Sequence, residues 1–420
     1  MRSASVFPCF AASIFLAAPC AIAQSSEPAP TAHVQAHDPS SATTVGWTWQ
    51  ADGVLFGTFN HQGGRRGGTD WRSQNWLMGM GSRPMGAGVV TVAGMVTLEP
   101  VTAGGRGYAS IFQAGEAYRG LPIVDRQHPH DVISQIAVAW TRPARGWSVT
   151  LVGAPVGEAT LGPPAFMHRG SAVDNPVAPL SHHIFDSTHV ASSVAAGRAQ
   201  RGRVALEAAV FHGREPDEHR YGIGVGAWDS WSARVWLSLG PEWTMQASRG
   251  FLNEVEELEA GDQRRTSMSA SWLRRRTDGY LALTAAVGWN QRTHSTSTAL
   301  LIEAAARRGA SAVYLRGERV GAETETLLFP QTVHVPHPGE LVDPVGALTA
   351  GGVRDLWTMR GVAVGVGGDV TTYFPPPLLR VTHGRRPSAF HVFFRIARAS
   401  TDHRMLESTM ASHGSAHQHR

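Results

Sequence analysis

The feature that most constrains this chain is an alternation of apolar and polar residues, repeated in about sixteen segments after residue 46. The gaps between these segments are alternately short and long. The short gaps have the composition of tight turns, for example Arg142–Gly146 and Met359–Gly361, whereas two of the long gaps run to about 30 residues. Short turns on one side and long loops on the other are typical of a transmembrane up-and-down β-barrel.

Each segment has one face suited to lipid and one suited to a wet interior. In the last segment, Val392 and Phe394 alternate with His391 and Arg395. Many of the 13 tryptophans lie near segment ends, as expected for indole at a membrane interface. We therefore predict an all-β protein, an antiparallel barrel of about 16 strands with long loops partly folded into the lumen. The segment boundaries also allow 14 strands, and a soluble β-sandwich is the alternative explanation of the tryptophans.

The chain divides into four expected regions. Residues 1–23 have the pattern of a secretory signal peptide, since Arg2 precedes an apolar stretch and Ala21-Ile22-Ala23 resembles a cleavage site. Residues 24–46 are rich in Pro, Ser, Thr and Ala and are expected to be disordered. Residues 47–398 form the predicted barrel, and residues 399–420 form a periplasmic tail that contains His and Met. The expected location is the outer membrane of a Gram-negative cell.

The cysteine content and the charge exclude several kinds of site. Cys9 and Cys20 both lie in the predicted signal peptide, so a metal site in the mature chain must use His, Met or carboxylate ligands. The formal net charge is only +4, and no basic run with interleaved aromatic residues indicates a nucleic-acid partner. The expected partners are outer-membrane lipid and a metal ion or small solute, whereas the oligomeric state is left open.

Histidine and aspartate are concentrated in two long gaps, which we expect to be loops. One gap runs from about Pro100 to Gln127-His128-Pro129-His130-Asp131, and the next from about Pro155 to Asp186. The strand after the second gap is predicted at Ser187–Ala196, followed by a turn at Gly197–Gly202. Since the loops are rich in proline, they are stiff enough to fold inward and to constrict a pore.

Imidazole and carboxylate groups suit copper or zinc, so these loops are a candidate metal site. We expect the two loops to meet inside the lumen, where His128, His130, His182 and His183, with Asp131 or Asp186, form a polar cluster. The alternative is a structural network in which the same groups bond to lumen arginines. The candidate metal ligands are His128, His130, Asp131, His168, His182, His183, Asp186 and His189.

Catalysis is the third interpretation of these loops. Asp186, Ser187 and His189 resemble a hydrolytic triad by composition, but neighbouring strand residues point to opposite faces and would not converge. We therefore predict no catalytic residue and no organic cofactor, and we do not expect an enzyme.

Several blocks together resemble a family of outer-membrane barrels from Gram-negative bacteria. They are Ala117–Pro122, Gln127–Asp131, Leu161–Arg169, Ser181–His189 and Gly213–Glu218. The resemblance extends over most of Trp47–Ala397 and implies an association with heavy-metal handling, especially of copper. Since it carries no established binding residues, the site proposals rest on residue chemistry.

Three functions are compatible with these patterns. The first is an outer-membrane channel or transport-associated barrel that handles copper or zinc ions. The second is an outer-membrane lipid hydrolase, which needs a Ser–His pair near the bilayer edge. The third is a structural or adhesin-like barrel whose loops bind a partner. We favour the channel because the histidine-rich loops are long enough to form a gate.

Overall fold

The computed structural model describes residues 46–255, 261–329 and 341–399. The predicted signal peptide (1–23), nearly all of the segment 24–46, and the tail 399–420 beyond Ala399 lie outside the described residues. Among the residues that are described, no helix is both long and apolar enough to cross a bilayer.

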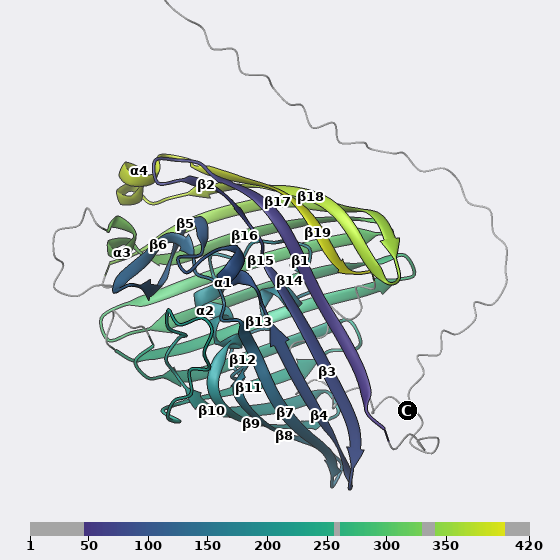
Figure 1. Ribbon diagram of the computed structural model, residues 1–420. Helices are drawn as coiled ribbons and strands as arrows, with labels where there is room; N and C mark the ends of the chain where they lie inside the picture. Colours follow the sequence, from purple (N-terminus) through teal and green to yellow (C-terminus); the bar gives the residue numbers. More distant parts are fainter. Residues whose placement is uncertain (1–45, 256–260, 330–340, 400–420) are drawn as a thin grey trace, which may run out of the picture. The chain divides into compact units, whose positions relative to one another are not determined.

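The described residues form a closed antiparallel barrel, because each strand pairs with its neighbours and the first strand, β1 (Thr48–Gln62), pairs with the last, β19 (Ser388–Arg398) (Figure 1). The short strand β2 (Gly68–Arg72) and the following β3 both pair with β1, so they count as one interrupted strand and the described barrel has 16. The predicted architecture is confirmed. The remaining barrel strands are β1 (Thr48–Gln62), β3 (Asn75–Met85), β4 (Gly88–Val96), β7 (Ile133–Ala144), β8 (Trp147–Gly157), β9 (Ala191–Arg201), β10 (Val204–His212), β11 (Ser230–Ser238), β12 (Trp243–Leu252), β13 (Gln263–Arg276), β14 (Gly279–Gln291), β15 (Thr296–Arg308), β16 (Ser311–Glu323), β17 (Val342–Met359), β18 (Val362–Phe374) and β19 (Ser388–Arg398).

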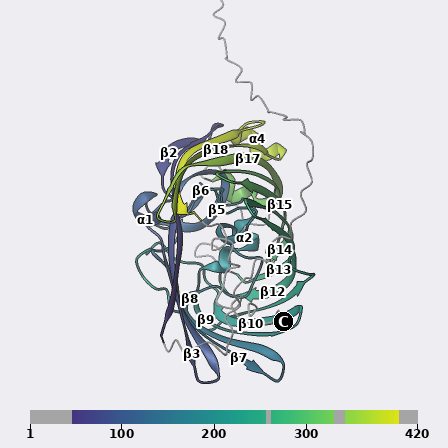
Figure 2. The same cartoon turned by 90° about the vertical axis from the view of Figure 1, so that its right-hand side faces the viewer.

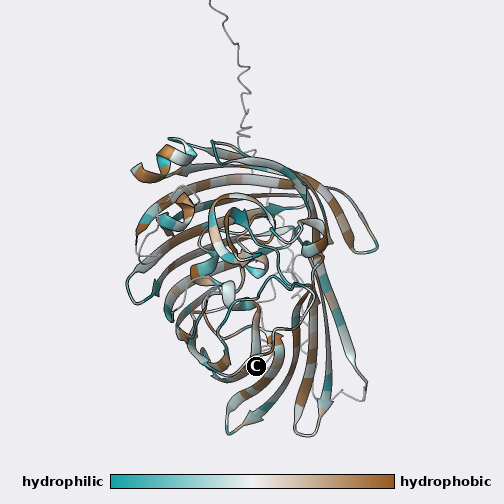
Figure 3. Cartoon of the chain, turned by 60° about the vertical axis from the view of Figure 1, so that its left-hand side comes forward, coloured by the Kyte–Doolittle hydropathy of each residue, from teal (hydrophilic) through white to brown (hydrophobic). Residues whose placement is uncertain are grey.

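The strand register places apolar side chains outward and polar side chains inward, as the alternation predicts. On β19, Val392 and Phe394 are 57% and 45% exposed, whereas His391 and Arg395 are buried. Figure 3 shows the resulting alternation of apolar and polar positions along the strands. The outer face is therefore a surface of exposed large hydrophobic residues, and the charged groups face the lumen.

Two long loops occupy the lumen, and Figure 2 shows parts of both inside the ring of strands. Loop two (residues 97–132) joins β4 to β7, and loop three (residues 158–190) joins β8 to β9. The elements of loop two are α1 (Glu99–Thr102), β5 (Tyr108–Tyr118) and β6 (Leu121–Gln127), and those of loop three are η1 (Phe166–His168), α2 (His182–Phe185) and η2 (Ser187–His189).

The β5–β6 hairpin is a difference from the sequence-based expectation of an irregular loop. The first six residues of β5, Tyr108–Gln113, are all buried. A strand that is covered on both faces need not alternate polar and apolar residues, so the pattern used for the barrel strands does not detect it.

The strand expected at Ser187–Ala196 is also displaced. Residues Ser187–His189 form the 3-10 helix η2, and β9 begins only at Ala191. Side-chain contacts hold this turn inside the lumen, since Arg265 Nη1 donates to Ser187 Oγ over 2.7 Å. The turn expected at Gly197–Gly202 is shorter than predicted, because Gly197 pairs with Ala208 in the sheet. The chain turns only at the end of this range, at Gly202, whose φ of 56° favours glycine.

Two further helices lie in loops on the same side of the barrel. They are α3 (Thr324–Leu328), which follows β16, and α4 (Pro377–His383), which precedes β19. His383 Nε2 lies 2.9 Å from Asp125 Oδ1 of β6, and Phe112 of β5 stacks on the His383 ring at 4.4 Å. These contacts connect the β5–β6 hairpin to the rim of the barrel.

Candidate metal centre in the lumen

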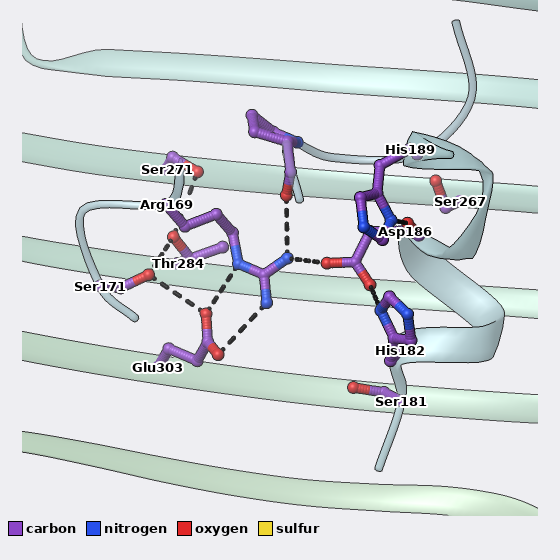
Figure 4. Close-up of polar contacts among 12 residues, drawn as sticks. Arg169, Ser171, Ser181, His182, Asp186, His189, Ser267, Ser271, Thr284 and Glu303 are labelled. Atoms are coloured by element: carbon purple, nitrogen blue, oxygen red, sulfur yellow. Dashed lines mark hydrogen bonds and ion pairs between the residues drawn. The ribbon is translucent and has the colours of Figure 1, made fainter. Parts of the chain in front are cut away.

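Loop three is fixed to the barrel wall by buried ion pairs. Arg169 Nε donates to Glu303 of β15 over 2.9 Å, and Arg169 Nη1 donates to Asp186 of the same loop over 2.7 Å. Figure 4 shows Arg169 between these two carboxylates. Arg316 of β16 also donates to Glu303 over 2.9 Å. Because buried charges are costly unless paired, this network specifies where loop three lies.

A second network holds the middle of loop three. Asp174 contacts Arg395, accepts two hydrogen bonds of 3.2 Å from Arg307, and accepts one of 3.2 Å from the Tyr280 hydroxyl. Asp355 pairs with the same two arginines, at 2.8 Å from Arg307 and 2.5 Å from Arg395. Arg395, which the alternation on the last segment predicts to face the lumen, thus helps to position loop three, and Arg307 of β15 does so as well.

Loop two brings a histidine to the same place. The carboxylate oxygen Oε2 of Glu99 accepts a hydrogen bond of 3.0 Å from the backbone N–H of His130 and one of 2.8 Å from its Nδ1. The His130 ring then lies beside loop three, with centroids 5.0 Å from His189 and 6.2 Å from His182. The two loops meet inside the lumen, as expected.

Three imidazoles converge at this contact. One ring nitrogen from each of His130, His182 and His189 lies within 4.8 Å of the other two. Zinc–nitrogen bonds of about 2.0–2.1 Å place the nitrogens of a tetrahedral site about 3.4 Å apart. Small rotations of the rings would therefore bring all three to one metal ion.

The Nδ1 nitrogen of each of these three rings has a hydrogen-bond partner, and this partner determines the tautomer of the ring. His182 Nδ1 donates to Asp186 Oδ1 over 2.7 Å, and His189 Nδ1 donates to the Asp186 carbonyl over 2.6 Å. His130 Nδ1 donates to Glu99. A neutral ring with its proton on Nδ1 has its lone pair on Nε2, which is the arrangement that metal-binding histidines adopt. Nε2 of His130 and Nε2 of His189 are buried without a hydrogen-bond partner.

The environment keeps two of these three rings neutral. Burial lowers the pKa of His182 to about 4, despite the neighbouring Asp186 carboxylate. Burial likewise lowers the pKa of His189 well below its ordinary value, and His130 and His182 add to the effect. At His130, burial would lower the pKa, but the Glu99 carboxylate outweighs it and raises the pKa. Neutral rings at His182 and His189 are available as ligands near pH 7.

Two further histidines lie next to this group. The His128 ring centroid is 5.3 Å from that of His183 and 6.2 Å from that of His130. The His183 ring is 5.5 Å from His182. Five of the predicted histidines therefore form one contiguous cluster, contributed by loops two and three.

Two candidate residues lie outside the cluster. The His168 ring packs against Trp76 of β3 with centroids 4.9 Å apart, and burial lowers its pKa to about 4. Asp131 pairs with Arg220 at 3.3 Å, and burial raises the pKa of Asp131 to about 6. Asp186, the second carboxylate among the candidates, orients two histidines: its carboxylate bonds to His182 and Arg169, and its backbone carbonyl bonds to His189.

Asp186, Ser187 and His189 do not have the geometry of a hydrolytic triad. The Asp186 carboxylate bonds to His182 and Arg169, whereas His189 bonds to the Asp186 backbone. Ser187 Oγ is engaged by Arg265. Ser187 and His189 therefore bond to different partners and not to each other, as a catalytic triad would require.

The centre borders a pocket that we call the β1 pocket. His130 and His189 line it together with Glu99, Trp76 and two methionines, Met95 and Met167. Sequence reasoning did not identify Glu99 as the partner of His130. Glu99 begins the short helix α1, and His130 lies 31 residues later in a stretch without regular structure, so no periodic pattern connects the two.

Comparisons with known proteins address the fold. No protein-family model matches the sequence, and no curated protein matches it either. Among solved structures, the chain is similar to Pseudomonas putida OprB in its high-pH structure, with 9% identity, a TM-score of 0.53, and coverage of 84% of this chain and 94% of that chain. It also aligns with the anion-selective porin from Comamonas acidovorans at 11% identity and a TM-score of 0.49, covering 84% and 100% of the two chains. The protein has the fold of outer-membrane porins.

Proposed function

We propose that the protein is a channel-type barrel of the Gram-negative outer membrane whose lumen binds a divalent transition-metal ion, copper or zinc. Loops two and three form both the gate and the metal centre. This proposal joins a porin-type fold to a cluster of histidines that the fold alone does not require.

The outer surface supports a membrane location. Large apolar side chains are exposed along strand after strand, including Leu206 (50%), Leu315 (55%) and Val392 (57%). In water, such a surface would promote aggregation, whereas in a bilayer it faces lipid. The closed barrel also pairs the backbone N–H and C=O groups of its strands, which hydrocarbon requires.

One observation carries the metal assignment: two buried imidazoles and one partly buried imidazole have their Nδ1 atoms fixed by Glu99 and Asp186, and one ring nitrogen of each lies within 4.8 Å of the other two. A purely structural network would be expected to satisfy both nitrogens of each buried ring. Buried Nε2 atoms without a partner on His130 and His189 are instead suited to a metal ion.

Of the two metals, we favour copper as the occupant. Met95 and Met167 line the β1 pocket beside His130 and His189. Thioether sulfur is a soft ligand that selects Cu(I), while imidazole accepts both Cu(II) and Zn(II). The resemblance to barrels associated with copper handling agrees with this preference.

The test is calorimetric titration of the purified full-length protein in detergent with Cu(II) and with Zn(II). We expect His189→Gln to weaken metal affinity by about 100-fold or more, beyond the 10–100-fold typical of losing an orienting partner. The matched control is His168→Gln, because His168 and His189 are equally buried, at 8% exposure each, and His168 lies outside the cluster. Equal affinities in the two variants would refute the proposed centre.

The C-terminal tail requires its own control, since His403, His413, His417 and His419 also bind metals in principle. The same comparison is therefore repeated with these four residues changed to Ala. Urea unfolding, followed by tryptophan fluorescence, confirms that each variant is folded. A difference between the two variants that vanishes in this background would assign the binding to the tail and contradict the proposal.

A further inference from the structure

Two histidines beside the metal centre have a different setting, and we infer that they are an entry station on the path of the metal ion. His128 and His183 would bind a divalent cation transiently and pass it to His130, His182 and His189. This inference rests on the proposed metal-binding function and adds a route and a direction to it.

His128 is oriented in the same way as His130 and His182 of the centre, through a carboxylate at its Nδ1 nitrogen. Its Nδ1 lies 3.0 Å from Glu116 Oε1, and its Nε2 is buried without a hydrogen-bond partner. Glu116 is itself held by a contact with Arg220 and adopts a φ of 57°, an uncommon conformation for a residue other than glycine. A strained and buried carboxylate that orients one imidazole is a feature typical of functional sites.

His183 connects this pair to a second pocket, the β14 pocket. Phe112, Leu180, His183, Glu215, Asn290 and Arg292 are among the residues that line it. It lies near the ends of β13–β17 on the long-loop side, since Gln263 begins β13 and Glu323 ends β16. A solute that enters this pocket would meet His183, which is the residue of the histidine cluster that lines it.

The ring of His183 is held beside a carboxylate and a glycine. Its Nδ1 lies 3.7 Å from Glu215 Oε1, and the second oxygen of Glu215 is buried without a hydrogen-bond partner. A Cβ on Gly115 would lie only 2.8 Å from Cε1 of this ring, and the φ of Gly115 is +142°. The close approach of the ring to the backbone therefore depends on glycine at this position.

Distances between rings describe a continuous route. The His183 and His128 centroids are 5.3 Å apart, His183 is 5.5 Å from His182, and His128 is 6.2 Å from His130. On the other side of the centre, His130 and His189 line the β1 pocket. The cluster thus separates two pockets, and a cation that moves between them would exchange one imidazole ligand for the next.

The entry pair holds a cation less completely than the centre does. In the described part of the chain, the group of three possible ligands within 4.8 Å is His130, His182 and His189. Two imidazoles and the more distant Glu215 provide a looser set, which suits passage more than residence. The charges around the β14 pocket are balanced, because Glu215 and Glu323 face Arg265 and Arg292.

Rapid mixing of the full-length protein with Cu(II) tests this route, with quenching of tryptophan fluorescence as the signal. The double variant His128→Gln with His183→Gln keeps side-chain bulk and removes the imidazoles. A residue on the path, but not in the final site, changes the association and dissociation rates equally and leaves Kd unchanged. We expect both rates to fall by about tenfold or more, since the ion loses a charge-assisted contact during passage. His168→Gln is the matched control and should keep wild-type rates.

The outcomes separate this inference from the proposed function. If the wild type binds no Cu(II) at the centre, both are overturned. If the double variant binds with wild-type rates, or binds faster, the entry station is wrong while the centre stands. If its Kd rises and its stoichiometry falls, the two histidines are part of the resident site, which also refutes a separate station.

Discussion

Replacing Asp174 by Asn should release loop three from the barrel wall. The Asp174 side chain is 1% exposed and contacts Arg395, Arg307 and Tyr280. In the variant, the two arginines retain only one shared carboxylate, that of Asp355. Removing one member of a buried ion pair typically costs about 3–5 kcal/mol, because the partner charge stays buried.

This cost appears as local opening of loop three, since Asp174 bonds the loop to three different strands. When opening is fast relative to cleavage, proteolysis follows the population of the open state. A cost of about 3–5 kcal/mol therefore predicts that cleavage within the loop accelerates by about 10²–10⁴-fold. The bond between Arg169 and Gly170 reports this opening, because the Arg169 side chain is only 2% exposed.

The assay is limited trypsin digestion of the purified protein, with mass spectrometry of the peptides that end at Arg169. The matched control is Asp278→Asn, which removes an exposed partner of Arg308 in a short turn. Surface ion pairs contribute about 0–1 kcal/mol, so this control should change cleavage at Arg169 little. Equal cleavage at Arg169 in Asp174→Asn and in the control would refute the argument that buried pairs hold loop three.

Two further predictions concern the lipid face and the metal centre. Phe394→Arg should destabilise the folded barrel by about 2–4 kcal/mol if residue 394 lies near the bilayer midplane, whereas Phe394→Leu should be tolerated. Urea unfolding in lipid vesicles measures the stability of both variants, and equal stabilities would show that Phe394 does not face lipid. Asp186→Asn should weaken Cu(II) affinity by about 10–100-fold, because the side-chain amide cannot accept hydrogen bonds from both His182 and Arg169. An unchanged Kd in calorimetric titration would show that Asp186 does not orient the histidines of the centre.

The barrel could be predicted from the sequence because the outer face of each strand is suited to lipid and the inner face to a polar lumen. On β10, Leu206 faces outward and Glu207 inward, and this contrast repeats with the period of a strand. The β5–β6 hairpin has no such contrast, since both of its faces are buried where Tyr108–Gln113 runs. Alternation reports an environment that differs between two faces, and it fails wherever both faces are covered.

The residue types of the candidate site could be predicted from the sequence, but the contacts between its residues could not. Histidines in stiff loops indicated where ligands are available, and His130, His182 and His189 do converge. The sequence pattern did not predict the partners of these histidines, because Glu99 of α1 and Glu116 of β5 contact His130 and His128 only through the tertiary fold. His168 has the same residue type and a similar loop setting as His189, but packing against Trp76 separates it from the others. Tertiary contacts therefore determine that His189 belongs to the cluster and His168 does not, and sequence spacing does not predict these contacts.

The ligands of the centre come only from loops two and three, so metal binding should hold these loops together. A ligand that binds the closed state alone stabilises it by about 2.7 kcal/mol at 100 times Kd, which slows cleavage by about 100-fold. Saturating Cu(II) should therefore reverse much of the trypsin sensitivity of Asp174→Asn at Arg169. The same metal should not protect the double variant Asp174→Asn with His189→Gln, because that variant lacks a ligand. Protection of both proteins would place the bound metal elsewhere, and protection of neither would mean that the metal does not bridge the loops.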